Sequence, residues 1–312
     1  MTSSRNMGQP TQDKNQPKKG SYTPAPGALT YNAYLKVNEL KQLQICQSDP
    51  AHHDEPLFII IHQAYELWFK LILHELDEVF AMMAAQRVRK ATFFMRRVNE
   101  IMKLLAHQIH ILETMSPRDF LGFRYNLSPA SGFGSSQFRE IEFMSGLRYP
   151  ELLEHFSGDP SYETLKKRME QPSLGEAFYT LLAKKGFKLA EAGESAGEAE
   201  IEQAQNKRVQ EIAKLYTDEE TYGDLHDLAE AFVEFDELLF LWRANHVIVV
   251  ERMIGFKRGT GGSEGVGYLQ TTLSKRCFPD LWKVRTVLEQ PEGGAGPQSQ
   301  SPPGKGGGCP FH

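Results

Sequence analysis

Two histidines, His62 and His246, lie in stretches where hydrophobic residues recur every three or four positions. This spacing puts each imidazole on the hydrophobic face of a helix, turned toward the interior of the fold. A histidine in that position is most often an ordinary core residue, but it can also be an axial ligand of haem iron. Two such histidines on two helices favour haem. Because the chain has no Cys-x-x-Cys-His motif, we expect haem b, bound non-covalently.

Two other groups of histidines offer alternatives to a haem site. The run from His52 to Glu55 (HHDE) has the composition of a metal site, but it precedes a helix, where acidic residues also suit the N-terminal dipole. His107 and His110 are three residues apart and could join His62 and Glu66 as a non-haem iron site. Spacing alone supports both alternatives less than it supports haem.

Arg124 and a glycine-rich loop carry groups that suit an amino-acid ligand. Arg124 lies among aromatic residues in RDFLGFRYNLSPASGF. A solvated arginine is the ordinary interpretation, whereas an arginine in a hydrophobic setting can hold a carboxylate by two parallel hydrogen bonds. The loop Gly259 to Gly267 (GTGGSEGVG) lacks the Gly-Lys-Ser/Thr ending of a phosphate loop. It is either a connector or a loop that closes over a ligand, with Thr260 or Ser263 as a hydroxyl donor.

Long helices are the elements expected to position these side chains. The periodicity predicts a helix that starts at Leu57, a second over residues 92–114, and a third over residues 224–254 that ends at Gly255. Residues 150–221 predict shorter surface helices, because prolines and glycines interrupt them. No stretch alternates as a strand would. We therefore predict an all-α fold, a single helical-bundle haem domain.

Composition narrows the class of protein further. The chain has 312 residues, a formal net charge of -5 and three cysteines. The near-neutral charge argues against a nucleic-acid partner, and the cysteine count favours a reducing cytoplasm. Apolar runs shorter than the ~18 residues of a membrane span argue against a membrane. Polar, Pro- and Gly-rich ends predict disordered tails over 1–28 and 290–312, which leaves one domain over 29–289.

Several runs of the sequence resemble the tryptophan 2,3-dioxygenase family, in chain order from about Leu29 to Leu288. These runs are LTYNAYLKVNEL (29–40), LFIIIHQAYELWFKLILHELDEV (57–79), the Arg124 segment with SPASGF (128–133), QFREIEF (137–143), LWRANHVIVVERMIGFKRGTGGSEGVGYL (241–269) and FPDLWKVRT (278–286). The resemblance implies an all-helical haem enzyme and a homotetramer. It also implies insertion of both atoms of O2 across the indole C2–C3 bond of L-tryptophan, giving N-formylkynurenine.

The resemblance assigns roles around the haem and the indole. By the family pattern, His246 is the proximal ligand of the haem iron and His62 is the distal histidine that meets the indole N–H. Phe58 and Phe120 would flank the indole. Ser131 falls in a loop that lies near the haem edge.

The resemblance also assigns the residues that bind the amino-acid part of the substrate. Arg124 would bind the carboxylate, and Thr260 would meet the ammonium and carboxylate end. Tyr31, Tyr34 and Leu35 match an N-terminal segment that completes the pocket of a neighbouring subunit in this family.

Three departures from the family pattern bear on the choice of substrate. Gly134 stands where glutamine is common, Ile61 replaces a residue that is often polar, and Glu264 stands where serine is common. They leave open a related haem oxygenase that inserts one oxygen into a tryptophan or related indole amino acid in a biosynthetic pathway. A haem or indole sensor is a further alternative, for which the Cys309-Pro310 pair in the C-terminal tail is slight support.

Overall fold

The computed structural model describes residues 27–130, 132–193, 195–257 and 265–288. The chain divides into two compact units, Met1–Ile45 and Cys46–His312, and each is described by itself. Every regular element in the described residues is a helix, which confirms the all-α prediction for that part of the chain.

The elements follow one another along the chain with short connections. In order they are α1 (Tyr31–Leu35), α2 (Val37–Leu40), α3 (Glu55–Ala84), α4 (Val88–Gln108), η1 (Ile109–Thr114), α5 (Pro117–Arg124), η2 (Tyr125–Leu127), η3 (Gly132–Gly134), α6 (Ser136–Met144), α7 (Pro150–Glu154), α8 (Tyr162–Glu170), α9 (Leu174–Lys184), α10 (Glu198–Ile212), α11 (Lys214–Thr217), α12 (Glu219–Ile254), α13 (Val266–Thr271) and α14 (Pro279–Val287), where η marks a 3-10 helix.

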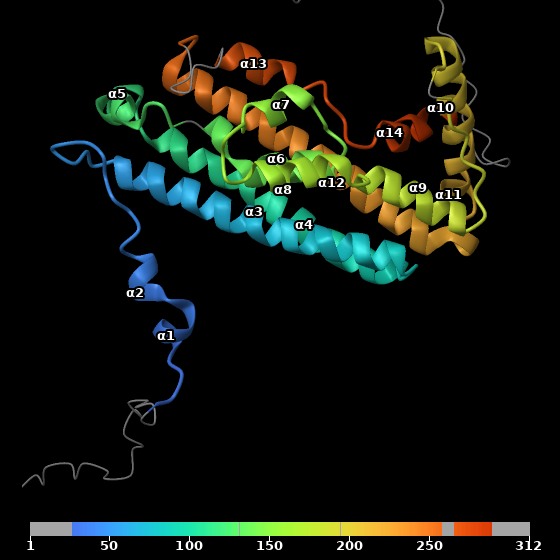
Figure 1. Ribbon diagram of the computed structural model, residues 1–312, viewed down its shortest axis with the longest axis horizontal. Helices are drawn as coiled ribbons and strands as arrows, with labels where there is room; N and C mark the ends of the chain where they lie inside the picture. The colour runs from blue at the N-terminus through green and yellow to red at the C-terminus, as the bar shows by residue number, and fades with distance from the viewer. Residues whose placement is uncertain (1–26, 131, 194, 258–264, 289–312) are drawn as a thin grey trace, which may run out of the picture. The chain divides into compact units, whose positions relative to one another are not determined.

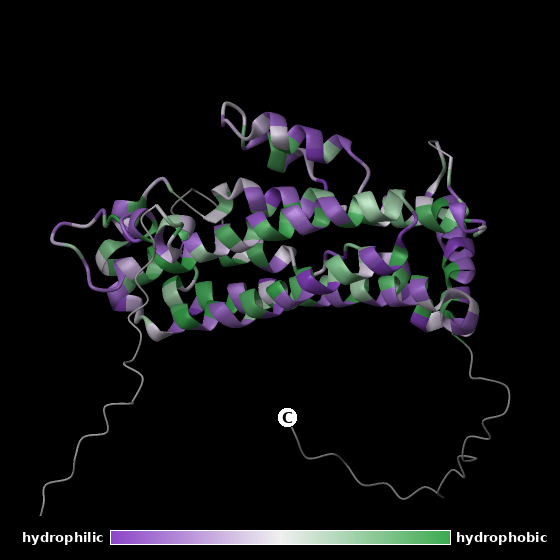
Figure 2. Cartoon of the chain, turned by 90° about the horizontal axis from the view of Figure 1, so that it is seen from below, coloured by the Kyte–Doolittle hydropathy of each residue, from purple (hydrophilic) through white to green (hydrophobic). Residues whose placement is uncertain are grey.

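The second unit is built on its three longest helices, α3, α4 and α12. Helix α4 packs along both α3 and α12, and the three run side by side in Figure 1. Each presents a stripe of hydrophobic residues at helical spacing to its neighbours. Figure 2 shows hydrophobic residues between the long helices. The largest fully buried side chains include Phe123, Phe178, Phe232, Phe235, Ile72, Leu76, Met95 and Met102.

Local signals in the sequence fix where the site-bearing helices begin and end. Ser116 caps α5, its hydroxyl accepting the backbone N–H of Asp119 at 3.1 Å, and Pro117 follows in the first turn. Asp218 caps α12 through the N–H of Thr221 at 3.1 Å. Gly255 ends α12 with φ of 58°, a backbone conformation that costs other residues free energy because they carry a Cβ atom.

Several helix boundaries differ from the sequence-based predictions. Helix α3 begins at Glu55 rather than at Leu57, and the second predicted helix ends as an α-helix at Gln108, after which the 3-10 helix η1 continues to Thr114. Helix α4 begins at Val88 rather than near Thr92, because Val88 and Ala91 are buried and extend its hydrophobic stripe into the basic link. Helix α12 begins at Glu219 and passes through Gly223, since the Asp218 cap starts the helix earlier than the hydrophobic pattern does.

Helix α3 is the one described helix that is long and apolar enough to span a membrane by length and composition. In this structure it packs against α4, α6 and α9, and ten of its residues are buried, among them Tyr65, Phe69 and Leu76. That packing is typical of a core helix.

The first unit contains two short helices, α1 and α2, that bury no residue. The hydroxyl of Thr30 caps α1 by accepting the N–H of Ala33 at 3.2 Å. The two tyrosines of α1 face solvent: Tyr31 is 75% exposed and Tyr34 is 71% exposed. A segment that exposes aromatic rings in this way has the character of an unpartnered binding surface.

Candidate functional site

His62 lies on α3, one turn after Phe58. Its Nδ1 is 2.7 Å from the backbone oxygen of Phe58, and because a carbonyl can only accept, Nδ1 carries the hydrogen. Burial lowers the pKa of His62, while the Phe58 carbonyl and the charge of Glu66 raise it, and the net shift is downward. In the neutral ring, Nε2 therefore has no hydrogen and is available to accept a hydrogen bond.

His246 lies on α12, one turn after Trp242. The Trp242 indole stacks on the imidazole with 5.3 Å between ring centroids and 18° between the planes. Burial lowers the pKa of His246 to about 4, with smaller effects from His62 and the Arg139 cation. At neutral pH the imidazole is uncharged, which is the form that binds a metal ion.

Aromatic side chains line the region between the two histidine-bearing helices. Phe138 on α6 lies 4.8 Å from Trp242 and 5.5 Å from Phe69, both between ring centroids. Tyr65 approaches Trp242 edge-on at 6.2 Å and donates its hydroxyl hydrogen to the Leu105 carbonyl at 2.8 Å. These contacts make a mainly hydrophobic wall that joins α3, α6 and α12, and such a wall suits a flat, apolar cofactor or ligand.

Helix α5 brings the predicted indole- and carboxylate-binding residues to the first turns of α3. The Phe120 ring lies 5.6 Å from Phe58, and the Phe58 ring lies 4.1 Å from the His62 imidazole. Arg124 is 94% buried on the same helix, since only 6% of it is exposed. The structure thus brings Phe58, His62 and Phe120 together and places Arg124 one turn after Phe120 on α5, where it is buried, so a solvated Arg124 is wrong.

Arg139 is a buried cation on α6 whose charge acts on His246. It pairs with Glu142, whose Oε1 also accepts a 2.6 Å hydrogen bond from Arg243. The Nε of Arg139 has no hydrogen-bond partner among the described residues. Two arginines against one carboxylate leave a buried positive charge. The propionate groups of a haem are carboxylates that could satisfy both this charge and the Nε donor, so these residues fit the cofactor.

The alternative metal sites are not supported. Among the described residues, no three histidine, cysteine, aspartate or glutamate side chains are grouped so as to hold a metal ion. In the run from His52 to Glu55, Glu55 is occupied by hydrogen bonds to Gln47 and Ser48. His110 lies 3.3 Å from Glu113 instead of joining His62.

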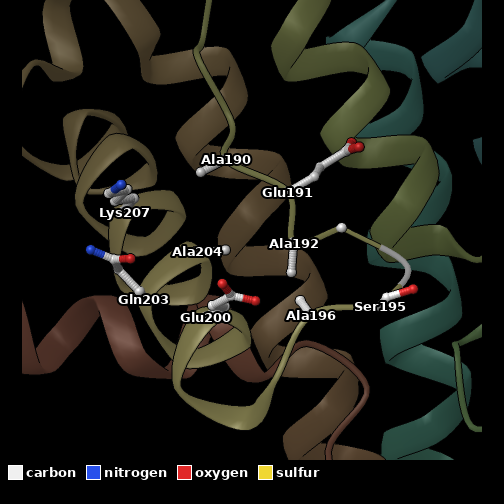
Figure 3. A pocket seen from close by; sticks show the side chains of 10 residues that line it. Ala190, Glu191, Ala192, Ser195, Ala196, Glu200, Gln203, Ala204 and Lys207 are labelled. Atoms are coloured by element: carbon white, nitrogen blue, oxygen red, sulfur yellow. The ribbon is translucent and has the colours of Figure 1, made fainter.

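A hollow of about 450 Å³ lies elsewhere on the chain, between the loop 190–196 and α10. Figure 3 shows that alanines of the loop and Glu200, Gln203 and Lys207 of α10 line it. It contains neither an aromatic side chain nor any of the predicted site residues. The residues that line it are therefore not part of the candidate site.

For two groups of predicted site residues the structure gives no position relative to these histidines. Ser131 and Thr260 lie outside the described residues, as does Glu264. Tyr31, Tyr34 and Leu35 belong to the first unit, where all three are exposed.

Two of the sequence departures have a visible setting. Ile61 is buried in the core, where a polar residue would need a partner. Gly134 is exposed in η3, and a side chain there would meet open space.

Sequence reasoning missed Arg139 and Glu142. Both lie in QFREIEF, and their three-residue spacing places an arginine and a glutamate on one face of a helix with hydrophobic neighbours. That pattern was the available signal. Sequence reasoning also missed Trp242 as the ring that stacks on His246.

Comparisons with known proteins show the family to which the chain belongs. A family model described as "Tryptophan 2,3-dioxygenase" matches residues 15–192 and 195–288. The tryptophan 2,3-dioxygenase of Herpetosiphon aurantiacus is 43% identical over 263 residues, which cover 84% of this chain and 99% of the relative. That of a Nocardioides species is 43% identical over 266 residues (83% and 95%). That of Myxococcus xanthus is 37% identical over 273 residues (87% and 94%).

Proposed function

Because the chain belongs to the tryptophan 2,3-dioxygenase family, we propose that it is a haem-dependent oxidoreductase that oxidises L-tryptophan to N-formylkynurenine. Both atoms of O2 enter the product across the indole C2–C3 bond, so the reaction balances without an external reductant. The observation that carries the proposal is the pair of neutral histidines, His62 and His246, beside a phenylalanine pair and a buried arginine.

His246 is the residue we propose as the axial ligand of the haem. Its low pKa supports this role, since no proton has to be displaced at neutral pH before the imidazole binds iron. Arg139 would hold the propionate side through its free Nε donor. When bound, haem supplies the iron chemistry that activates O2.

His62 is proposed to orient the indole rather than to act as a strong base. Its Nδ1 hydrogen is held by the Phe58 carbonyl, so its Nε2 is directed by that bond to accept the indole N–H. An indole is electron-rich and needs no full deprotonation to react with activated oxygen. A neutral acceptor that fixes the ring is sufficient.

Phe58, Phe120 and Arg124 are proposed to complete substrate recognition. The two phenylalanines supply apolar faces for the indole and exclude water from it. Arg124 would bind the carboxylate by two parallel hydrogen bonds, which fixes the distance between the amino-acid end and the reacting C2–C3 bond. Thr260 would add a hydroxyl at the same end, and Ser131 would lie near the haem edge.

We also propose a homotetramer in which Tyr31, Tyr34 and Leu35 complete the pocket of a neighbouring subunit. The support is that this short segment buries none of its own residues and exposes its aromatic rings. Exposed Ile60 and Leu67 on α3 offer additional hydrophobic surface for association.

Single turnover of the haem-loaded, anaerobically reduced protein tests the proposed function. After addition of L-tryptophan and ¹⁸O2, we expect N-formylkynurenine that carries two labelled oxygens by mass spectrometry. A product with one labelled oxygen would mean a different oxygenase reaction. No product from a protein that binds haem and L-tryptophan would overturn the proposal.

A further inference from the structure

The first turn of α3 carries a buried carboxylate, Glu55, that none of the roles above uses. Glu55 has no exposed surface. Its oxygens accept the backbone N–H of Gln47 at 2.5 Å, the backbone N–H of Ser48 at 3.1 Å, and the Ser48 hydroxyl. The Ser48 oxygen in turn accepts the backbone N–H of His52 at 2.8 Å. Together these bonds hold residues 47–52 as a closed loop against the start of α3.

The same loop contacts α5 at one point and the residues just after α5 at a second. At the first, the His52 ring lies against Gly122, where an added Cβ would be 2.9 Å from both Cδ2 and Nε2 of the imidazole. Side-chain atoms do not approach that closely without one of them moving. At the second, Asn126, just after α5, donates its Nδ2 hydrogen to the Gln47 carbonyl at 3.2 Å.

The loop therefore connects two helices that both contribute to the proposed substrate site. Glu55 lies on α3 three residues before Phe58, and Gly122 lies on α5 between Phe120 and Arg124. Helix α5 has only eight residues, so it depends on outside contacts for its position more than the long helices do.

We propose that Glu55, Ser48, His52 and Gly122 form a clamp that sets where α5 presents Arg124 to the substrate. These are positioning residues, and the clamp acts on the carboxylate end of the amino acid through Arg124. The inference rests on the proposed function, because it assumes that Arg124 binds the substrate carboxylate. A misplacement of about 1 Å at such a residue is enough to lower the productive binding of a substrate.

The central experiment compares Glu55→Gln with a matched control, Glu75→Gln. The glutamine keeps the shape of the side chain but turns an NH2 group toward the N–H donors of the loop. Glu75 is also buried on α3, where it pairs with Arg97 at 2.7 Å, about 30 Å farther along the helix at 1.5 Å per residue. We expect Glu55→Gln to raise KM for L-tryptophan about 10-fold with kcat within about twofold of wild type, and Glu75→Gln to leave KM unchanged.

A second ligand separates positioning from general damage to the fold. Tryptamine has the indole and the amine of tryptophan but no carboxylate. Its Kd, measured by perturbation of the ferric Soret band, should be the same in wild type and Glu55→Gln. The Kd of L-tryptophan should rise. In an Arg124→Ala background, Glu55→Gln should have no further effect on L-tryptophan binding, because the two residues act in series.

The glycine contact gives an independent test that leaves Glu55 intact. Gly122→Ala should push the His52 ring aside and raise KM for L-tryptophan, and adding His52→Ala should cause no further rise, because both changes break the same contact. Gly223→Ala is the matched control, because Gly223 is also helical and an added Cβ there meets nothing within 4 Å.

The outcomes separate the clamp from the proposed function. If the wild type binds L-tryptophan but does not oxidise it, the proposed function fails, and the two Kd values still decide the clamp. If Glu55→Gln weakens tryptamine and L-tryptophan equally, or matches Glu75→Gln, the clamp is overturned. If Glu55→Gln does not fold, the decision passes to the glycine variants, and a Gly122→Ala variant with the same KM for L-tryptophan as Gly223→Ala overturns the clamp.

Discussion

At the scale of single residues, one hydrogen bond defines the chemical character of the site. The bond from His62 Nδ1 to the Phe58 carbonyl fixes which nitrogen carries hydrogen. The low pKa of His246 fixes the other imidazole as neutral. Two neutral rings leave one nitrogen suited to iron and one suited to a substrate N–H, which is a division of roles that residue types alone do not determine.

His246→Ala should remove most haem from the purified protein. Loss of the axial ligand leaves only hydrophobic packing and the propionate contacts to hold the cofactor. Haem content by the pyridine haemochrome assay is expected to fall at least about tenfold, with partial recovery when imidazole is added during reconstitution. An unchanged Soret band in the variant would exclude His246 as the ligand.

His62→Ala should lower kcat/KM by about 10- to 100-fold and leave measurable turnover, because the residue orients the indole rather than removing its proton. The wild type should also discriminate strongly against 1-methyl-L-tryptophan, whose indole nitrogen has no hydrogen, and the variant should do so less. Complete loss of turnover in a haem-loaded variant would instead indicate an essential base.

At the scale of elements, the long helices were predictable and their connections were not. The hydrophobic stripe of α12 runs through Phe232, Phe235 and Leu239 to His246, as the spacing predicted. The closeness of Phe58 to Phe120 depends on how the short helix α5 packs against α3, and no local sequence pattern encodes that packing. Composition predicted Glu55 as a possible metal ligand. It instead accepts hydrogen bonds from the backbone of Gln47 and from the backbone and hydroxyl of Ser48, and no sequence pattern identifies these donors.

Phe232→Ala should test the packing of α12 independently of the site. Phe232 is fully buried between Phe178, at 5.4 Å, and Phe278, stacked at 4.9 Å between ring centroids. A cavity of this size costs about 3–5 kcal/mol of unfolding free energy. Urea denaturation of the haem-free protein should report this loss, and a cost below about 1 kcal/mol would mean that the core collapses around the cavity.

The clamp should also leave a mark on the pH dependence of stability. Burial raises the pKa of Glu55, but the hydrogen bonds from Gln47 and Ser48 outweigh it, so the net shift is downward from 4.5. A carboxylate with a lowered pKa stabilises the fold above its unfolded pKa and loses this effect as the pH falls. The Tm advantage of wild type over Glu55→Gln should be full at pH 6 and shrink below pH 4.5. A Tm difference between wild type and Glu55→Gln that does not change with pH would contradict this expectation.

At the scale of the whole molecule, each of the two compact units exposes large hydrophobic side chains. The first unit has two short helices with exposed tyrosines, and α3 exposes Ile60 and Leu67. These are the surfaces that association would cover.

Light scattering coupled to size exclusion should give a mass about four times the 35.4 kDa of one chain. Replacing Tyr31 and Tyr34 by serine should weaken L-tryptophan binding, because each pocket would lose its cover from a neighbour. A monomeric, fully active wild type would contradict both expectations.

The two cysteines in the described residues differ in burial, and this difference allows a single position next to the clamp to be labelled. Cys277 lies buried between α13 and α14, and burial raises the pKa of its thiol well above the ordinary value. Cys46 is partly exposed and directly precedes Gln47. Maleimides react with the thiolate, so once Cys309 is replaced by serine, a dye should label Cys46 alone. Cys46 thus provides a fluorescent reporter position directly beside the clamp residues.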